Sequence, residues 1–387
     1  MKVLKTKYCF SISEVSEDTF RTLGCDHSFY FSRHFLAAFE TSNPHISFSY
    51  LLFYEDKSPV ALAILQQMDV ALDNAIENLP LSDRIARSVQ CYLNNRKSRV
   101  LVCGNIFLSG SFGLYVKNGF SKRMVYDTLS RKLAPNLFRE FKSLKTQRSS
   151  NVFFLKDFNA QEDAYANVAE QHQFQSFTME PNMRLAINWP SFERYKESLK
   201  SKYRVKVNKA DTTSASLIVK HLNSAEILEH KKRLEELYSN VTEGATFNAG
   251  KLNIETYVQL KDAFGKNLIF NTYWKDQELV GFATGFKVGK QLDAHFIGID
   301  YEYNKQFAIY PRMLNDYVRM AIDLGVAEVN LGRTAAEIKS TLGAVPEHLR
   351  CYVKHKRSVA NMLFKPLIRQ IKMTEFKQHT PFKSLSK

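Results

Sequence analysis

The stretch that decides the fold is residues 268–343, LIFNTYWKDQELVGFATGFKVGKQLDAHFIGIDYEYNKQFAIYPRMLNDYVRMAIDLGVAEVNLGRTAAEIKSTLG. It contains three apolar, β-rich runs separated by short polar segments, which predicts three antiparallel strands joined by turns. These runs are residues 268–273, 279–288 and 292–299. Residues 309–324 then carry apolar side chains at helical spacing, and Gly325 stands just past the predicted helix end. Residues 326–331 predict a fourth strand, which a charged loop follows.

Three strands, a helix and a fourth strand form an order that resembles the core of the GNAT acyltransferases. The resemblance is closer to the tandem GNAT proteins that include the peptidoglycan-bridge aminoacyl transferases, the Fem family. It is carried by Gly281, Gly298, Tyr310 and Gly332-Arg333…Lys339…Gly343, and by the basic segment Ser198-Leu199-Lys200-Ser201-Lys202-Tyr203-Arg204. The resemblance covers roughly residues 30–356. It implies an α/β protein with mixed α+β sheets, built from two GNAT-like units in tandem.

An internal repeat supports two units. Residues 54–61 align with residues 274–281, at an offset of 220. Both segments have an aromatic residue, a polar turn around an Asp and a small residue in the second strand, which indicates the same hairpin twice. We therefore expect a GNAT-like domain at 1–188, a second and catalytic one at 189–356, and a basic amphipathic tail at 357–387.

The charge of the chain is strongly positive and unevenly placed. The net charge is +15, and residues 350–387 contribute +9 of it, with ten Lys and Arg against Glu375 alone. A basic balance favours anionic partners such as CoA, an acidic acyl carrier protein (ACP), RNA or an anionic membrane face. For the apolar and basic stripe at 357–377, two interpretations remain: packing on the body of the protein, or peripheral contact with a lipid surface or a carrier protein.

The sequence offers no sign of export or of a metal site. No apolar stretch approaches the roughly 20 residues that span a bilayer, and the N-terminus lacks an apolar signal core. We expect a cytoplasmic protein, with membrane association at the inner face as the alternative. The cysteines are odd in number and scattered, which predicts reduced, buried thiols and no zinc site. They are Cys9, Cys25, Cys91, Cys103 and Cys351.

Three residues are candidates for catalysis. Acyl transfer to an amine needs a base for the amine proton and an acid for the leaving group. His295 and Asp300 lie on or just after the third strand, and Asp293 shares a strand face with His295, so its carboxylate can raise the basicity of the imidazole. Tyr310, at the start of the helix, can donate a proton to a leaving thiol. Ordinary packing roles for His295 and Tyr310 remain as alternatives.

The resemblance places an acyl donor between the third strand and the strand after the helix. The helix N-terminus would face the donor's pyrophosphate, because free N–H groups and the helix dipole favour anions. Candidate cofactor-binding residues are therefore Gly298, Lys305, Ile309 and Arg312. Residues 301–308 lack the Gln/Arg-x-x-Gly-x-Gly/Ala pattern of acetyl-CoA enzymes. Either the donor is another carrier, acyl-ACP or aminoacyl-tRNA, or Lys305 and Arg312 replace the missing loop.

Cationic segments supply the candidate substrate-binding residues, which are Lys202, Tyr203, Arg204, Arg333 and Lys339. Arg333 can fork onto a carboxylate or phosphate, and Lys339 can supply a point charge. The alternatives are a solvated helix face around Lys202 and an internal ion pair of Arg333 with Glu337 or Glu328. Residues 109–113, a Gly/Ser loop, form either a structural turn or a phosphate cradle.

Three functions fit these patterns. The first is an N-acyltransferase that moves an acyl group from acyl-CoA or acyl-ACP to a primary amine of an amino acid or an aminolipid, with no metal. The second is an aminoacyl-tRNA-dependent transferase acting on a cell-wall precursor. It is less favoured because Fem proteins often carry a long helical arm for tRNA, and no extended heptad stretch occurs here. The third is a non-catalytic binding module with the GNAT fold.

Overall fold

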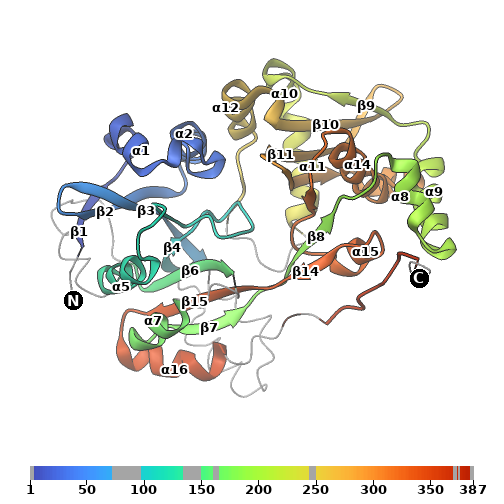
Figure 1. Cartoon of the computed structure of the whole chain (residues 1–387). Coiled ribbons are helices and arrows are strands. Elements are labelled where there is room, and N and C mark those ends of the chain that lie inside the picture. The colour runs from blue at the N-terminus through green and yellow to red at the C-terminus, as the bar shows by residue number, and fades with distance from the viewer. Residues whose placement is uncertain are drawn as a thin grey trace. The chain divides into compact units, whose positions relative to one another are not determined.

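The computed structural model describes residues 4–71, 97–133, 150–159, 165–243, 250–368, 373 and 375–383. The chain forms two compact units, each with its own sheet (Figure 1). Unit 1 is Met1–Met179 with His348–Met373, and unit 2 is Glu180–Glu347 with Thr374–Lys387. The α/β class with mixed sheets is therefore confirmed. Of the cysteines, Cys91 lies outside the described residues, and the other four are buried thiols.

Unit 1 is a mixed sheet of order β1-β2-β3-β4-β6-β15-β7, in which β5 pairs with β3. Among the described strands of this unit, β4 and β6 pair in parallel and the other pairs are antiparallel. Its strands are β1 Lys5–Cys9, β2 Ser47–Glu55, β3 Ser58–Ala71, β4 Lys97–Cys103, β5 Leu114–Val116, β6 Val152–Asn159, β7 Gln175–Thr178 and β15 Leu349–His355. Its helices are α1 Glu17–Leu23, α2 Arg33–Ser42, α5 Lys122–Lys132, α7 Ala166–Gln171 and α16 Ser358–Ile368, with short 3-10 turns at Ile12–Glu14, Cys25–His27 and Phe29–Phe31.

Unit 2 is a mixed sheet of order β14-β8-β13-β12-β11-β10-β9; among its described strands β12 and β13 pair in parallel, and the other pairs are antiparallel. Its strands are β8 Asn182–Ala186, β9 Ile218–His221, β10 Leu268–Lys275, β11 Glu278–Val288, β12 Gln291–Ile299, β13 Glu328–Asn330 and β14 Val345–Glu347. Its helices are α8 Phe192–Ser198, α9 Ser201–Thr213, α10 Ser224–Glu229, α11 Lys231–Glu243, α12 Glu255–Phe264, α13 Tyr301–Phe307, α14 Ile309–Asp323 and α15 Ala336–Ser340, with a 3-10 turn at Gly265–Asn267.

The repeat seen in the sequence is the same hairpin in both units. Tyr54 pairs with Pro59 in β2–β3, and Trp274 pairs with Leu279 in β10–β11, at the predicted offset. Each hairpin has a register shift just before this aromatic residue. Asp56 and Asp276 both adopt a left-handed backbone, which the tight turn requires. Local sequence therefore fixed both the turn and the register.

Each sheet includes one strand that directly follows, along the chain, a strand of the other unit's sheet. β8 follows β7 along the chain but pairs with β13 and β14, and β15 follows β14 but pairs with β6 and β7. The predicted division at 188/189 and 356/357 therefore differs from the observed one. A short apolar strand fits either sheet locally, and only long-range pairing decides which sheet it joins.

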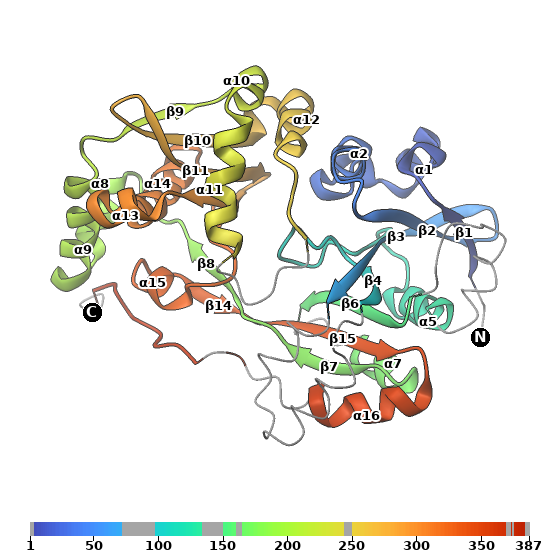
Figure 2. The same cartoon turned by 180° about the vertical axis from the view of Figure 1, so that it is seen from behind.

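The two faces of the unit 2 sheet are covered by different helices (Figure 2). α14 packs on one face, where Cβ atoms added at Gly281 and Gly285 would meet Met313 and Tyr317. α11 and α12 cover the other face, with Leu237 of α11 beside Gly298 and Tyr257 of α12 bonded to Thr284. Because α14 begins beside Gly281, which pairs with Ile299, the helix starts at the carboxyl end of β12.

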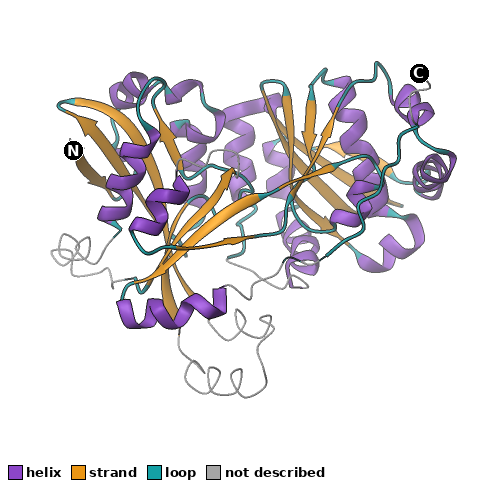
Figure 3. Ribbon diagram, turned by 60° about the horizontal axis from the view of Figure 1, so that its bottom comes forward, coloured by secondary structure: helices purple, strands orange, loops and turns teal. Residues whose placement is uncertain are grey.

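Three local predictions need correction. Residues 301–307, expected as a loop, form α13, because Asp300 caps it by accepting from the amides of Glu302 and Tyr303. Residues 336–340, within the predicted loop after β13, form α15. α16 runs through Pro366, where the proline in the apolar stripe predicts either two short helical pieces or a helix start. Pro366 has no amide proton for the carbonyl of Met362, so the helix continues through this position without that one hydrogen bond. Helices and strands of both units are distinguished in Figure 3.

Replacing Gly298 by alanine should destabilise unit 2. A Cβ there would lie 2.2 Å from the Phe282 ring and 2.8 Å from Leu237 Cβ. Overpacking of this kind costs about 1–3 kcal/mol. Urea unfolding should show a larger loss for Gly298→Ala than for Gly285→Ala, where the nearest atom, the Asp293 carbonyl oxygen, would lie 3.0 Å away. Equal losses for the two variants would show that the Phe282 ring moves aside freely.

Candidate functional site

The two parallel strands at the centre of unit 2 separate soon after they meet. β12 pairs with β13 only at Gln291, Leu292 and Asp293, and from Ala294 to Ile299 that edge of β12 has no strand partner among the described residues. We call this segment the β12–β13 split. Residues 294–297 are partly exposed although the strand is central in the sheet. If β12 and β13 paired along their whole length, no acyl donor could bind between them. They do not pair beyond Asp293, so a donor site between them remains open to test.

The point where the strands separate is fixed by buried side chains. Asn330 Nδ2 donates to Asp293 Oδ1 at 3.1 Å, and Gln291 Nε2 donates to the same oxygen at 2.6 Å. Asn330 Oδ1 in turn accepts from the Gly332 amide at 3.0 Å. Asp293 and Asn330 are both buried. Because a buried carboxylate must keep its partners, these bonds hold β12 and β13 together at Asp293 and turn the chain away at Gly332.

His295 lies in the split, at a bulge of β12. The register of β11–β12 shifts between Ala283 and Gly285, so that His295 and Phe296 both oppose Thr284. His295 Nδ1 lies 2.7 Å from the Tyr257 hydroxyl, and that hydroxyl lies 3.0 Å from Thr284 Oγ1. Thr284 Oγ1 donates to the Phe296 carbonyl at 2.7 Å. Bulges often aim a side chain out of the regular alternation, as this one aims His295 toward α12.

The directions of these bonds fix the tautomer of His295. A carbonyl only accepts, so the Thr284 proton is committed to Phe296 and Thr284 Oγ1 must accept from Tyr257. Burial raises the pKa of Tyr257, so its hydroxyl is intact and holds one proton, which is then committed to Thr284. His295 Nδ1 must therefore be the donor to Tyr257. In the neutral imidazole this places the lone pair on Nε2, the atom that a general base uses.

The N-terminus of α14 offers little to a phosphate. The Tyr310 amide donates to Asn304 Oδ1 at 2.9 Å, Pro311 has no amide proton, and the Arg312 amide bonds to the Ala308 carbonyl at 3.0 Å. Three of the first four positions of α14 therefore have no N–H left for an external anion. The expected pyrophosphate site at this helix end is not supported by its backbone.

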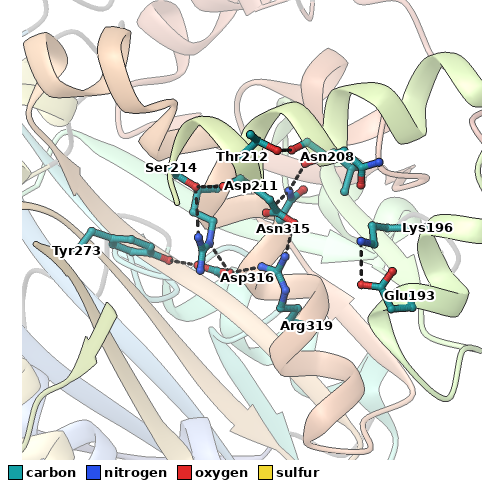
Figure 4. A network of polar contacts seen from close by, with 12 residues as sticks. Glu193, Lys196, Asn208, Asp211, Thr212, Ser214, Tyr273, Asn315, Asp316 and Arg319 are labelled. Atoms are coloured by element: carbon teal, nitrogen blue, oxygen red, sulfur yellow. Dashed lines mark hydrogen bonds and ion pairs between the residues drawn. The ribbon is translucent and has the colours of Figure 1, made fainter. Parts of the chain in front are cut away.

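Arg312, predicted to replace the missing phosphate loop, is held inside the protein. Its Nε donates to Asp316 at 2.9 Å, and its Nη1 donates to Ser214 Oγ at 3.2 Å. Figure 4 shows the network around Asp316, which also includes Arg319 and Tyr273. Arg319 bonds to Asp211 as well. Two arginines against two aspartates leave no net charge for a ligand, so the structure gives Arg312 a role in joining α9 to α14.

Four other predicted residues have structural contacts. Asp300 caps α13 and pairs with Arg233 Nη2 at 2.9 Å. Gly298 is a close-packing position against Phe282, and Ile309 is fully buried in the core beside Gly281. Tyr203 is buried, and its hydroxyl lies 3.2 Å from His379 Nδ1. Asp300 therefore serves as a helix cap, and the other three contribute to packing.

Tyr310 keeps the properties of an acid. Its side chain packs against the core on the α14 side of the sheet, and burial raises its pKa to about 12. It therefore retains its proton at neutral pH. His295 faces α12 and Tyr310 sits on α14, so the two candidate groups lie on opposite faces of β12.

The loop after β13 has an unusual backbone that a buried lysine holds. Gly332, Thr334 and Ala335 all have positive φ, which costs energy for the two residues with side chains. Lys339 Nζ donates to the Gly332 carbonyl at 3.2 Å and to the Arg333 carbonyl at 2.6 Å. Burial lowers the pKa of Lys339 to about 7. Lys339 thus positions this loop at the end of the split, and Arg333 is partly buried within it.

The exposed side of α9 carries cations without ion pairs. Lys202, Lys206 and Lys209 are exposed at helical spacing, and the described residues give none of them a carboxylate within 4.0 Å. Arg204 is partly buried on the same helix, and Lys305 is exposed in the last turn of α13. These groups remain available to an anionic partner.

The corresponding position in unit 1 is filled by the chain itself. β4 and β6 pair from Val100 to Cys103, and beyond them Lys156 bonds to Asp157 and to the Leu108 carbonyl. The Gly110 amide donates to Asp157 Oδ2 at 3.0 Å. The Gly/Ser loop at 109–113 therefore binds a protein carboxylate where a phosphate would lie, which supports the structural turn.

Sequence reasoning missed Tyr257 and Thr284. Tyr257 lies on α12 and Thr284 on β11, and neither the helical spacing nor the strand alternation sets these residues apart from their neighbours. Their role depends on tertiary contact with His295. The described residues contain no group of three or more His, Cys, Asp or Glu placed to hold a metal, and none of their helices is long and apolar enough to cross a bilayer.

Comparison with known proteins identifies the fold. No protein family model and no curated protein sequence matches the chain. Among solved structures it is similar to FemX, with a TM-score of 0.51 and 10% identity over 93% of this chain and 100% of that one. It is similar to a tandem GNAT protein from the clavulanic acid biosynthesis pathway, with a TM-score of 0.53 and 10% identity over 91% and 99%.

A third similar structure is the C-terminal domain (DUF2156) of a protein assigned as a lysylphosphatidylglycerol synthetase, from Agrobacterium fabrum. Its TM-score is 0.51 at 8% identity over 93% of this chain and 97% of that one. Likeness at such low identity concerns the fold, and the tandem GNAT architecture predicted from the sequence is confirmed.

Removing the Tyr257 hydroxyl should release the tautomer of His295. In the native protein, ¹⁵N NMR of labelled histidines should show His295 protonated at Nδ1 and bare at Nε2. In Tyr257→Phe the fixed acceptor is lost, so the two tautomers should mix. His221→Gln, at a histidine on β9, is the control for assignment and fold. A native protein with its proton on Nε2 would refute the bond directions.

Burial of Lys339 should make stability depend on pH. Its pKa is about 7 in the folded state and about 10.4 in an unfolded chain, so the unfolded chain binds more protons between these values. The free energy of unfolding should therefore rise from pH 7 toward pH 10, by at most about 1.4 kcal/mol per pH unit from this group. Urea unfolding of Lys339→Met should lack this rise, and Lys206→Met should keep it. Parallel curves for all three proteins would contradict the buried, neutral lysine.

Proposed function

We propose that unit 2 is an N-acyltransferase that moves an acyl group from a phosphopantetheine thioester, acyl-CoA or acyl-ACP, to a primary amine of an amino acid or an aminolipid. The observation that carries the proposal is the β12–β13 split with His295 inside it, its tautomer set for proton acceptance. The similarity to tandem GNAT structures supports the same class of reaction. We propose the cytoplasm as the location of this reaction, as expected from the sequence.

The opposite placement of His295 and Tyr310 suits the two proton transfers of this reaction. A thioester carbonyl bound at the open edge of β12 would lie between the two faces of the sheet. The face that α12 covers carries His295, and the face that α14 covers carries Tyr310. His295 Nε2 takes a proton from the amine as the C–N bond forms, and the C–S bond then breaks. The thiolate receives the proton of the Tyr310 hydroxyl, which is intact at neutral pH, and solvent then returns a proton to Tyr310 and takes the one held by His295. Backbone N–H groups along the unpaired edge of β12 are suitable donors for the oxyanion.

The charges of unit 2 favour acyl-ACP over free acyl-CoA. The amides at the start of α14 are already bonded, so a diphosphate gains little there. The cations that remain available are Lys202, Lys206 and Lys209 on the outside of α9. A row of exposed lysines attracts an acidic protein surface more than it encloses a small ligand. Carrier recognition through α9 would leave only the pantetheine arm and the acyl chain to enter the split.

The test is a thiol-release assay with the purified chain, using an acyl-CoA or the same acyl group on ACP together with a mixture of amino acids and aminolipids. Acyl-ACP should be the better donor, and the N-acyl product should be detected by mass spectrometry. His295→Gln should lower kcat about 10²-fold or more, because a general base contributes about that much. His221→Gln, on the outer strand β9, should leave kcat unchanged.

A charge variant distinguishes the donors. Lys202→Glu, Lys206→Glu and Lys209→Glu combined should raise KM for acyl-ACP and leave acyl-CoA turnover unchanged. Turnover only with aminoacyl-tRNA would instead establish the second function, a transferase of the Fem type on a cell-wall precursor. No transfer from any donor, together with an unaltered cellular phenotype for His295→Gln, would establish the non-catalytic module.

A further inference from the structure

Two buried side chains of the helix α16 attach it to unit 1, and both lie on the same side of the helix. Asn361 is buried, accepts from the His355 amide at 2.9 Å and donates to the Gln173 carbonyl at 2.8 Å. Ile368, two turns later on the same side, is also buried. These two residues fix the rotation of the helix, so its opposite side is held outward from β7 and β15 (Figure 2).

The outward side of α16 is apolar. Val359 is 69% exposed and Met362 is 67% exposed, the two largest values among the exposed large hydrophobic residues that the structure describes. Pro366, one turn after Met362, is exposed as well. Single exposed apolar residues are common on protein surfaces, but here they share one face of one helix.

The segment that contains α16 carries charge of one sign. Residues 348–374 contain no Asp or Glu. Arg357 precedes α16 and Lys365 lies one turn after Met362; both are exposed, and no carboxylate among the described residues lies within 4.0 Å of either cation. An apolar strip bordered by cations matches an anionic lipid surface, because the strip enters the acyl boundary while the cations remain at the headgroups.

We propose that α16 docks unit 1 on a membrane that contains anionic lipids. The helix lies in the plane of the interface, with Val359, Met362 and Pro366 toward the lipid. Binding is weak and reversible, because two large side chains and a few cations contribute less than a pair of lipid anchors. It falls with salt, since part of the attraction is electrostatic. This docking does not depend on the reaction proposed for unit 2.

Sedimentation with vesicles tests the docking. The full-length protein should bind vesicles of phosphatidylcholine with 30% phosphatidylglycerol, and should bind pure phosphatidylcholine at least tenfold more weakly. Val359→Glu combined with Met362→Glu should abolish binding, and Lys365→Gln should weaken it roughly fivefold. Leu228→Glu, at an exposed apolar residue of α10 in unit 2, should bind as the native protein does.

Thermal unfolding separates folding from docking, because every substituted side chain is exposed and the unfolding midpoint should not change. Equal binding to both kinds of vesicle would overturn the proposal. So would unchanged binding of the Val359→Glu, Met362→Glu variant, or a comparable loss in Leu228→Glu. If that double variant binds lipid normally but loses affinity for an acyl carrier protein, the surface belongs to the carrier and the lipid proposal fails.

Discussion

Hydrogen bonding between β12 and β13 ends after three residue pairs, and the functional features of unit 2 depend on that ending. Within a sheet, a parallel neighbour normally satisfies the whole edge of a strand, so an edge that is left open must be held open by other bonds. Here the buried pair of Asp293 and Asn330 fixes the last point of contact. Lys339 satisfies the carbonyls of Gly332 and Arg333, and the left-handed residues Thr334 and Ala335 follow, so the chain turns away from the gap. The site therefore consists of backbone that a few buried polar side chains prevent from pairing.

The bulge in β12 gives this open edge its chemistry. Without it, side chains would alternate strictly, and His295 and Phe296 would face opposite sides of the sheet. With it, both oppose Thr284, and His295 reaches Tyr257 on α12. The bulge thus brings His295, on the strand that borders the split, into hydrogen bonding with the hydroxyls of Tyr257 and Thr284. These hydroxyls set which ring nitrogen of His295 carries the proton. Polar networks of this kind are effective when their buried members are satisfied, and the Tyr257 and Thr284 hydroxyls each have two hydrogen-bond partners.

The two units have the same strand order and differ at the place that matters. Both have one parallel strand pair, and both lose that pairing toward its carboxyl end. In unit 1 the Gly104–Gly113 loop and the buried pair of Lys156 and Asp157 occupy the position. In unit 2 the corresponding edge of β12 remains partly exposed. A shared fold therefore supports a structural role in one unit and a candidate reaction site in the other, because a few side chains decide whether the edge is covered.

The sequence by itself determined the elements whose hydrogen bonds are local. The hairpins at 54–61 and 274–281, the helix that became α14 and the turn at Gly325 all follow from side-chain alternation, helical spacing and turn residues. Tertiary structure alone decided which sheet the strand at 349–355 joins, that Arg312 is neutralised by Asp316, and that Tyr257 orders His295. Periodicity reports which side of an element is apolar, whereas the place of strand 349–355 and the bond between Tyr257 and His295 depend on partners 38 or more positions away in the chain. For Arg312 the partner lies only four residues away, but the Ser214 bond and the burial that commit it come from α9 packing on α14.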